Sequence, residues 1–135
     1  MIELAGVSHS LGGRRVLDAI DLSVPRGAFV ALVGPSGSGK TTLLKMINRL
    51  IEPDQGSVRV DDQNVCERPA AELRRGIGYV IQGIGLFPHL DIAENIAMVP
   101  RLCGIAPKAR AARAQELLQL VALPPEAAHR MPASL

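Results

Sequence analysis

One stretch of the sequence decides the fold: Gly34-Pro35-Ser36-Gly37-Ser38-Gly39-Lys40-Thr41. It fits the pattern G-x-x-x-x-G-K-[ST], in which the backbone N–H groups of a glycine-rich loop surround phosphate. The glycines let the backbone approach an anion closely, because a Cβ would obstruct it. The stretch therefore predicts a phosphate-binding loop (P-loop), with Lys40 on the β- and γ-phosphates and the Thr41 hydroxyl as a Mg²⁺ ligand.

The sequence on either side of this loop supports the prediction. Residues 28–33 are a continuous apolar run of strand length, as expected for a parallel strand buried on both faces. After the loop, helical spacing separates the apolar residues Leu43, Met46, Ile47 and Leu50. A P-loop lies between a strand and a helix, and the positive end of that helix adds to its affinity for phosphate.

Length and composition exclude several other classes of protein. The chain has 135 residues, 47% of them hydrophobic, which suits one modest folded domain and argues against disorder. A net charge of +2 does not indicate a nucleic-acid-binding protein. No apolar run approaches the roughly eighteen residues of a membrane span. Cys66 and Cys103 are far apart in the sequence and read as reduced thiols.

The remaining patterns predict a mixture of strands and helices. Residues 2–8 and 15–24 read as strands joined around Gly12-Gly13, and 57–61 alternates like a half-exposed strand. Residues 77–81 read as a second buried parallel strand.

The predicted helices outside the P-loop unit are recognised by their ends and composition. A short helix is expected over 69–75, with Pro near its first turn. Asp91 followed by Glu94 marks the start of another helix, and 107–122 is a longer, Ala-rich one.

A second informative cluster begins with Gln82, directly after the predicted strand 77–81. The cluster continues with Gly85-Leu86-Phe87-Pro88-His89 and Glu94-Asn95-Ile96. A glutamine here can place its amide oxygen on a metal ion, or position a water molecule with its NH₂ group. The whole run closely resembles the Q-loop region of ATP-binding-cassette (ABC) transporter ATPases.

The resemblance covers essentially the whole chain and implies a fold. The class is α/β, a P-loop NTPase of the ABC ATPase type, with an antiparallel β subdomain and a partial parallel core sheet. Residues 1–33 and 57–66 would form the antiparallel subdomain and lead into the core, and 34–56 and 67–85 the P-loop core. Residues 86–135 would form an incomplete helical subdomain.

Within the family, the segment 77–89 is particularly similar to quaternary-amine importers, which take up glycine betaine, choline, carnitine or proline. The implied function is an ATP-binding subunit that couples ATP binding and hydrolysis to osmoprotectant uptake, with ATP and Mg²⁺ as cofactors. Residues Gly34 to Thr42 would bind the phosphates, including Pro35, Ser36, Gly37, Ser38 and Gly39. Gln82 would ligate Mg²⁺ and sense the γ-phosphate.

The resemblance also implies partners. The segment from about Gly83 to Met98 would face an integral-membrane permease, with Phe87, Pro88 and Leu90 as apolar anchors. A second ATPase subunit would complete a homodimer, and a substrate-binding protein would take part indirectly. The expected location is the cytoplasmic face of the inner (plasma) membrane as a peripheral subunit, with no nucleic-acid partner.

Several positions depart from the family pattern. Leu11 stands where relatives stack an aromatic ring on adenine, and Val16 would pack the base from the other side. Leu11 can cover a base by dispersion but lacks the stacking of a ring. Gly83 stands where osmoprotectant relatives have a second glutamine.

The sequence ends where the family's signature motif would begin, before the Walker B strand. These residues alone are therefore expected to bind nucleotide without hydrolysing it, and to be poorly soluble. Asp61 and Asp62 follow an apolar strand but do not replace the missing acids, because Arg59 breaks the buried pattern.

Three other functions remain as alternatives. The chain could be a non-catalytic nucleotide-binding module, or belong to the ATPase of a polar-amino-acid importer. A small-metabolite kinase is disfavoured, because Arg110 and Arg113 with Glu116 read as a solvated helix face rather than as a closing lid.

Overall fold

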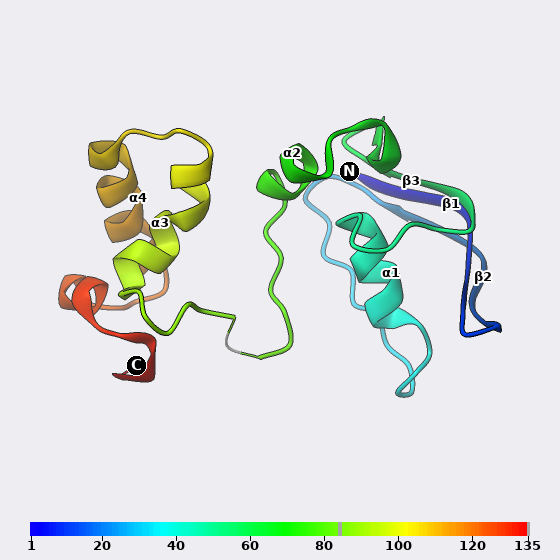
Figure 1. Ribbon diagram of the computed structural model, residues 1–135, viewed down its shortest axis with the longest axis horizontal. Helices are drawn as coiled ribbons and strands as arrows, with labels where there is room; N and C mark the ends of the chain where they lie inside the picture. The colour runs from blue at the N-terminus through cyan, green and yellow to red at the C-terminus, as the bar shows by residue number, and fades with distance from the viewer. Residues whose placement is uncertain (84, 135) are drawn as a thin grey trace. The chain divides into compact units, whose positions relative to one another are not determined.

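The computed structural model describes residues 1–83 and 85–134 (Figure 1). Ile84 of the predicted Q-loop run and Leu135 of the C-terminal stretch lie outside the described residues. The chain divides into two compact units, Met1–Tyr79 and Val80–Leu135. The finer division into subdomains that the sequence suggested stays a prediction.

The first unit is built on an antiparallel sheet in the order β2-β1-β3-β4. Its strands are β1 (Ile2–Leu11), β2 (Arg14–Val24), β3 (Gln55–Val60) and the short β4 (Gln63–Asn64). Gly12 and Gly13 join β1 to β2 with φ of 57° and 79°, as a two-residue hairpin turn of the type I′ class requires. The strands predicted over 2–8, 15–24 and 57–61 are confirmed.

An irregularity in the β1–β2 pairing places two apolar side chains in the core. The register shifts between Leu4 and Val7, and both residues are buried. Side chains bond two main-chain N–H groups at this shift and at the next one, between Val7 and His9. The Gly6 N–H donates to Asp21 Oδ1 at 2.7 Å, and the Ala19 N–H donates to Ser8 Oγ at 2.9 Å. The bulge therefore turns Val7 toward the same side as Leu4, and side chains accept hydrogen bonds from two main-chain N–H groups of the irregular region.

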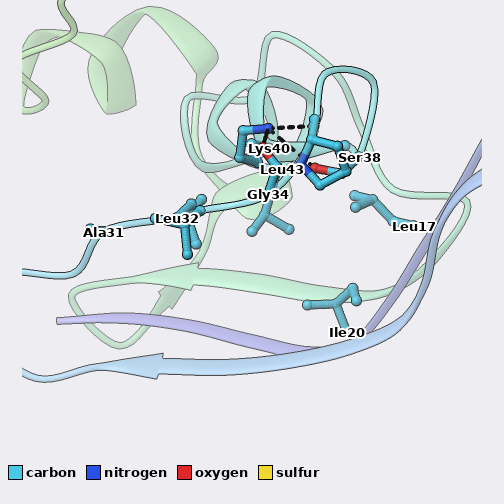
Figure 2. A pocket seen from close by; sticks show the side chains of 11 residues that line it. Leu17, Ile20, Ala31, Leu32, Gly34, Ser38, Lys40 and Leu43 are labelled. Carbon is cyan, nitrogen blue, oxygen red and sulfur yellow. Dashed lines mark hydrogen bonds between the residues drawn. The ribbon is translucent and has the colours of Figure 1, made fainter.

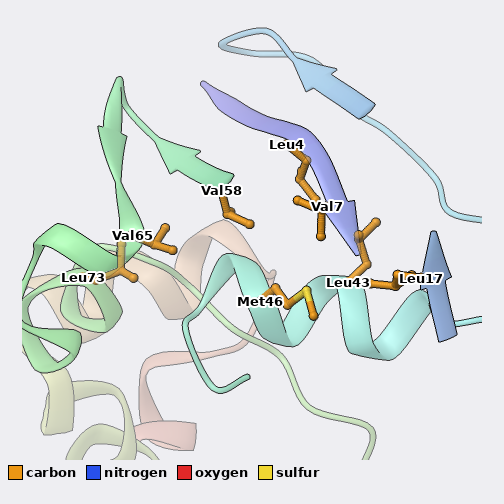
Figure 3. Close-up of a cluster of buried hydrophobic side chains, with 8 residues drawn as sticks. All are labelled: Leu4, Val7, Leu17, Leu43, Met46, Val58, Val65 and Leu73. Carbon is orange, nitrogen blue, oxygen red and sulfur yellow. The ribbon is translucent and has the colours of Figure 1, made fainter. Parts of the chain in front are cut away.

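Helix α1 (Lys40–Ile47) packs on this sheet through Leu43 and Met46 (Figure 3). The core is completed by the 3₁₀ turn Val65–Glu67 and by α2 (Ala70–Arg75). Its buried members are Leu4, Val7, Leu17, Leu43, Met46, Val58, Val65 and Leu73. The helix predicted around Leu43, Met46 and Ile47 is thus confirmed, and so is the short helix after Pro69.

Leu50, however, lies beyond the end of α1 and is 48% exposed. The helix ends at Asn48, because Arg49 adopts a left-handed conformation with φ of 50°. The Arg74 guanidinium donates to the main-chain oxygens of Asn48 and Arg49. A cation is thus placed at the carbonyl end of α1, where the helix dipole favours it.

The two predicted parallel strands are wrong as secondary structure. Neither 28–33 nor 77–81 is a strand, so no partial parallel core sheet exists among the described residues. Phe29, Val33 and Val80 are 95%, 90% and 94% exposed. A parallel strand needs hydrogen-bonded neighbours that arrive through long crossovers, and the described sheet contains only β1 to β4.

The second unit is helical, with α3 (Ile92–Leu102), α4 (Pro107–Leu120) and the 3₁₀ turns Pro125–His129 and Pro132–Ser134. Its small core consists of Ile92, Leu118, Ala127 and Ala128. The helix start predicted at Asp91 is confirmed as a capping box with Glu94. Helix α4 ends before the predicted Ala122, which has φ of 57°. Across the described ranges, no helix has the length and apolar character needed to cross a membrane.

Candidate nucleotide-binding site

The P-loop connects residues 28–33 to α1. Two of its positions require glycine because of their backbone conformation. Gly37 and Gly39 have φ of 80° and 90°, and Gly39 is the N-cap of α1. A Cβ on Gly39 would lie 2.8 Å from Leu17 Cδ2 and 3.0 Å from the Val16 carbonyl oxygen. The loop is thus seated directly against β2, and only glycine fits at this contact.

Lys40, the first residue of α1, folds its side chain back over the loop (Figure 2). Its Nζ donates to the carbonyl oxygens of Gly34 at 2.8 Å and Pro35 at 2.7 Å, and to Ser38 Oγ at 3.2 Å. All three acceptors are neutral, and among the described residues no carboxylate pairs with this ammonium. Its positive charge is therefore uncompensated beside the positive end of α1, which favours an anion at this point.

The predicted base-covering residues and the predicted phosphate-binding residues from Ser36 to Thr42 meet in one cavity of about 390 Å³. Leu11 and Val16 come from the β1–β2 hairpin, and the rest from the P-loop and the first turn of α1. The lining residues are Leu11, Val16, Ser36, Gly37, Ser38, Gly39, Lys40, Thr41 and Thr42. The cavity thus combines apolar side chains with hydroxyl groups and an ammonium. This combination suits a ligand that has a flat base and a phosphate chain.

Gly34 and Pro35 instead line an adjoining cavity of about 500 Å³. Its other walls include the apolar side chains of Ile20, Leu32 and Leu43 (Figure 2). Although this cavity is larger, it lacks the hydroxyl groups of Ser36, Thr41 and Thr42. The smaller cavity therefore fits a nucleotide better.

The two predicted Mg²⁺ ligands, Thr41 and Gln82, belong to different units of the chain. Thr41 lines the nucleotide cavity at the start of α1, so its hydroxyl fits a cation held beside phosphate. Gln82 belongs to the second unit, where it is exposed and follows no strand. Its approach to Thr41 stays a prediction.

The residues described from Gly85 to Asp91 form no regular secondary structure, but hydrogen bonds to Asn95 fix the path of the chain from Phe87 to Asp91. Asn95 Nδ2 donates to the carbonyl oxygens of Phe87 at 3.1 Å, Leu90 at 2.9 Å and Asp91 at 2.9 Å. Asn95 Oδ1 accepts from the Phe87 N–H at 2.8 Å. The Asn95 side chain therefore holds this loop closed. Phe87, which lies in the loop, is 47% exposed.

No role was predicted for Asn95 from the sequence. The available signal was an asparagine one helical turn after the Asp91 cap, where its amide can reach the preceding loop.

Asp61 and Asp62 form the turn between β3 and β4, with φ of 48° and 66°. Asp61 Oδ1 accepts from the Met1 amino group at 2.8 Å and from Arg26 Nη2 at 2.9 Å. The hydrogen bond from Met1, followed by the charge of Arg26, lowers the pKa of Asp61. These acids do not line the nucleotide cavity, in agreement with their reading as part of a hairpin.

Sequence comparison agrees with this geometry. The profile of the ABC transporter family matches residues 17–135. The chain belongs to this family. The match includes the P-loop, α1 and the Asn95-stabilised loop before α3.

Curated relatives include ATP-binding subunits of osmoprotectant importers. The glycine betaine/carnitine/choline transport ATP-binding protein OpuCA of Bacillus subtilis is 49% identical, over 100% of this chain and 36% of that protein. The osmoprotectant import ATP-binding protein OsmV of Salmonella typhimurium is 50% identical, over 81% of this chain and 28% of that protein. The chain spans about a third of the length of these relatives.

Solved ABC cassettes share the fold. One is the dimeric structure of a post-hydrolysis state of the ATP-binding cassette MJ0796 bound to ADP and Pi, with a TM-score of 0.81 and 30% identity. The alignment covers 100% of this chain and 63% of that one. An ATP-binding subunit of another ABC transporter matches with a TM-score of 0.85 and 26% identity, covering 55% of its own chain. The predicted fold class is confirmed, apart from the parallel strands.

Proposed function

We propose that the chain forms the nucleotide-binding part of a transport ATPase that couples ATP binding and hydrolysis to uptake of a quaternary-amine osmoprotectant. The solute would be similar to glycine betaine, choline or proline. The observation that carries this proposal is the cavity in which Leu11 and Val16 meet the P-loop residues. The similarity to osmoprotectant importers supports the solute class.

In this proposal the residues around the nucleotide have distinct tasks. Lys40 leaves its neutral carbonyl acceptors and donates to the β- and γ-phosphates, because a charged acceptor forms the stronger hydrogen bond. The N–H groups at the start of α1 donate to the phosphate oxygens. Leu11 and Val16 cover the base and exclude water from it. The Thr41 hydroxyl and the Gln82 amide oxygen would hold Mg²⁺, which supplies charge neutralisation at the phosphates.

The exposed loop before α3 supports the proposed permease contact. We assign the segment from Gly83 to Met98 to permease contact, with Phe87, Pro88 and Leu90 as anchors. Asn95 fixes the loop that carries them, so little conformational entropy is lost on docking. A second ATPase subunit would complete the functional dimer at the cytoplasmic face of the membrane, with the substrate-binding protein acting indirectly.

The test uses the full-length gene product reconstituted with its permease in proteoliposomes. Lys40→Ala is expected to lower ATP hydrolysis about 100-fold or more, because a charged donor at a transition-state phosphate is removed. Uptake of labelled glycine betaine should fall in parallel. Lys108→Ala removes the same charge from an exposed position of α4 and should change neither quantity.

Other outcomes identify the alternatives. Hydrolysis that drives uptake of a polar amino acid, and not of a quaternary amine, would overturn the solute assignment. Nucleotide binding without hydrolysis in the full-length product would identify a non-catalytic module.

A further inference from the structure

The β1–β2 hairpin presents a third side chain beside the two that cover the cavity. Leu11 is paired directly with Arg14 across the two-residue turn, and Ser10 is paired with Arg15. Residues directly opposite each other in an antiparallel pair lie on one face, as do alternate residues along a strand. Leu11, Arg14 and Val16 therefore share a face, and Leu11 and Val16 line the nucleotide cavity.

We propose that Arg14 is a base-binding residue whose guanidinium stacks on the adenine of ATP at the open side of this cavity. The proposal rests on the proposed function, since it requires ATP in the P-loop cavity. It names the residue that supplies planar contact to the base.

The cavity itself offers the base little more than dispersion. Its apolar cover consists of Leu11, which is 68% exposed, and the half-buried Val16. No aromatic side chain is among the residues described as lining it. A guanidinium is planar and weakly hydrated, and it stacks on the π-face of a base in a way that an aliphatic side chain cannot.

The two neighbouring arginines differ in availability. Arg15 Nη1 donates to Asp18 Oδ1 at 2.8 Å, so its guanidinium is already engaged on its own strand. Within the described ranges, the side chain of Arg14 forms no hydrogen bond or ion pair, and the residue is exposed. Alternation along β2 also places Arg15 on the opposite face from Arg14 and Val16. Arg14 is thus available to a ligand, and Arg15 is a matched control.

The test measures the affinity of the full-length protein for MgATP and for magnesium tripolyphosphate, which has the phosphates but no base. Arg14→Ala is expected to raise the Kd for MgATP about tenfold, in the range of base-stacking losses. The Kd for tripolyphosphate should be unchanged. Arg15→Ala should leave both values unchanged.

A second pair of variants separates stacking from charge. Arg14→Lys keeps the charge without the planar group, and should weaken MgATP binding nearly as much as Arg14→Ala. Adding Leu11→Tyr to Arg14→Ala should restore the affinity, because a ring at the paired position supplies the missing stacking.

Unchanged MgATP affinity in Arg14→Ala would overturn the proposal, and so would equal losses for both ligands, which would indicate phosphate contact. If the unmodified protein binds neither ligand, the proposed function itself fails. If the unmodified protein binds both ligands and Arg14→Ala binds them equally well, the proposal for Arg14 fails while the proposed function stands.

Discussion

Strands β1 and β2 pair along their length, whereas residues 28–33, which are entirely apolar, form no strand. β1 and β2 are joined by the two-residue turn at Gly12 and Gly13, so each finds its partner within a few residues. The apolar segments 28–33 and 77–81 need neighbours from distant parts of a chain.

The difference shows that an apolar run indicates which residues favour burial. It does not show that a partner is present to bury them. Antiparallel pairs closed by a short turn lose little loop-closure entropy, while parallel pairs require a crossover of a dozen residues or more. Val7 is fully buried and Val80 is 94% exposed, although both lie in apolar, strand-like sequence.

The largest effect is expected at Gly56, in β3. It has φ of 83°, and an added Cβ would collide with the main-chain oxygens of Ala5 and Gly6. Gly56→Ala should lower the free energy of unfolding by about 2–4 kcal/mol, because strain and overpacking add and neither backbone can move freely. Urea denaturation of the 135-residue chain measures it.

The matched control is Gly78→Ala, in the unpaired segment 77–81. No atom lies within 4 Å of the added Cβ there, and the backbone is not left-handed. Equal destabilisation by the two substitutions would contradict the contrast between paired and unpaired segments.

A smaller effect is expected from one substitution made in both regions. Val7→Ala removes a side chain with 0% exposure and should cost about 2 kcal/mol. Val80→Ala, at 94% exposure, should change the stability of the 135-residue chain by less than about 0.5 kcal/mol. Repeating the pair in the full-length gene product sharpens the comparison. A cost for Val80→Ala that arises only there would show that this segment gains a partner.

The smallest effect concerns pH at the edge of the paired sheet. The Met1 amino group and Arg26 lower the folded-state pKa of Asp61. Its contribution to stability is therefore present above the unfolded Asp pKa of about 3.9, and is lost as the pH falls through the lowered folded value. Asp61→Asn should therefore slightly reduce the loss of stability that occurs as the pH falls below about 4. The midpoint of urea denaturation, measured at a series of pH values, tests this.

Asp62→Asn is the control for this experiment. It introduces the same residue at the other left-handed position of the turn, where the carboxylate has no partner among the described residues. An acid limb that Asp62→Asn flattens as much as Asp61→Asn would refute the assignment to the Met1 and Arg26 contacts.

Several local features could be read directly from residues. The P-loop follows from its glycines with Lys40 and Thr41, the hairpin from Gly12-Gly13, and the start of α3 from Asp91 with Glu94. Each depends on contacts within a few residues, so neighbouring residue types suffice to predict it. The early end of α1 at Asn48 could not be predicted in this way, because Arg74 stabilises it from 26 residues away.

By itself, the sequence determined the phosphate loop and the β1–β2 hairpin, because spacing and turn chemistry act over short distances, and it indicated the family through a resemblance that covers the whole chain. Only the tertiary structure seated Gly39 against β2 and gave Asn95 its contacts with the loop before α3. Only the tertiary structure, too, left 28–33 and 77–81 without strand partners. Such contacts join residues that are far apart in the sequence. They depend on which surfaces meet in the folded chain, and no local sequence pattern specifies that.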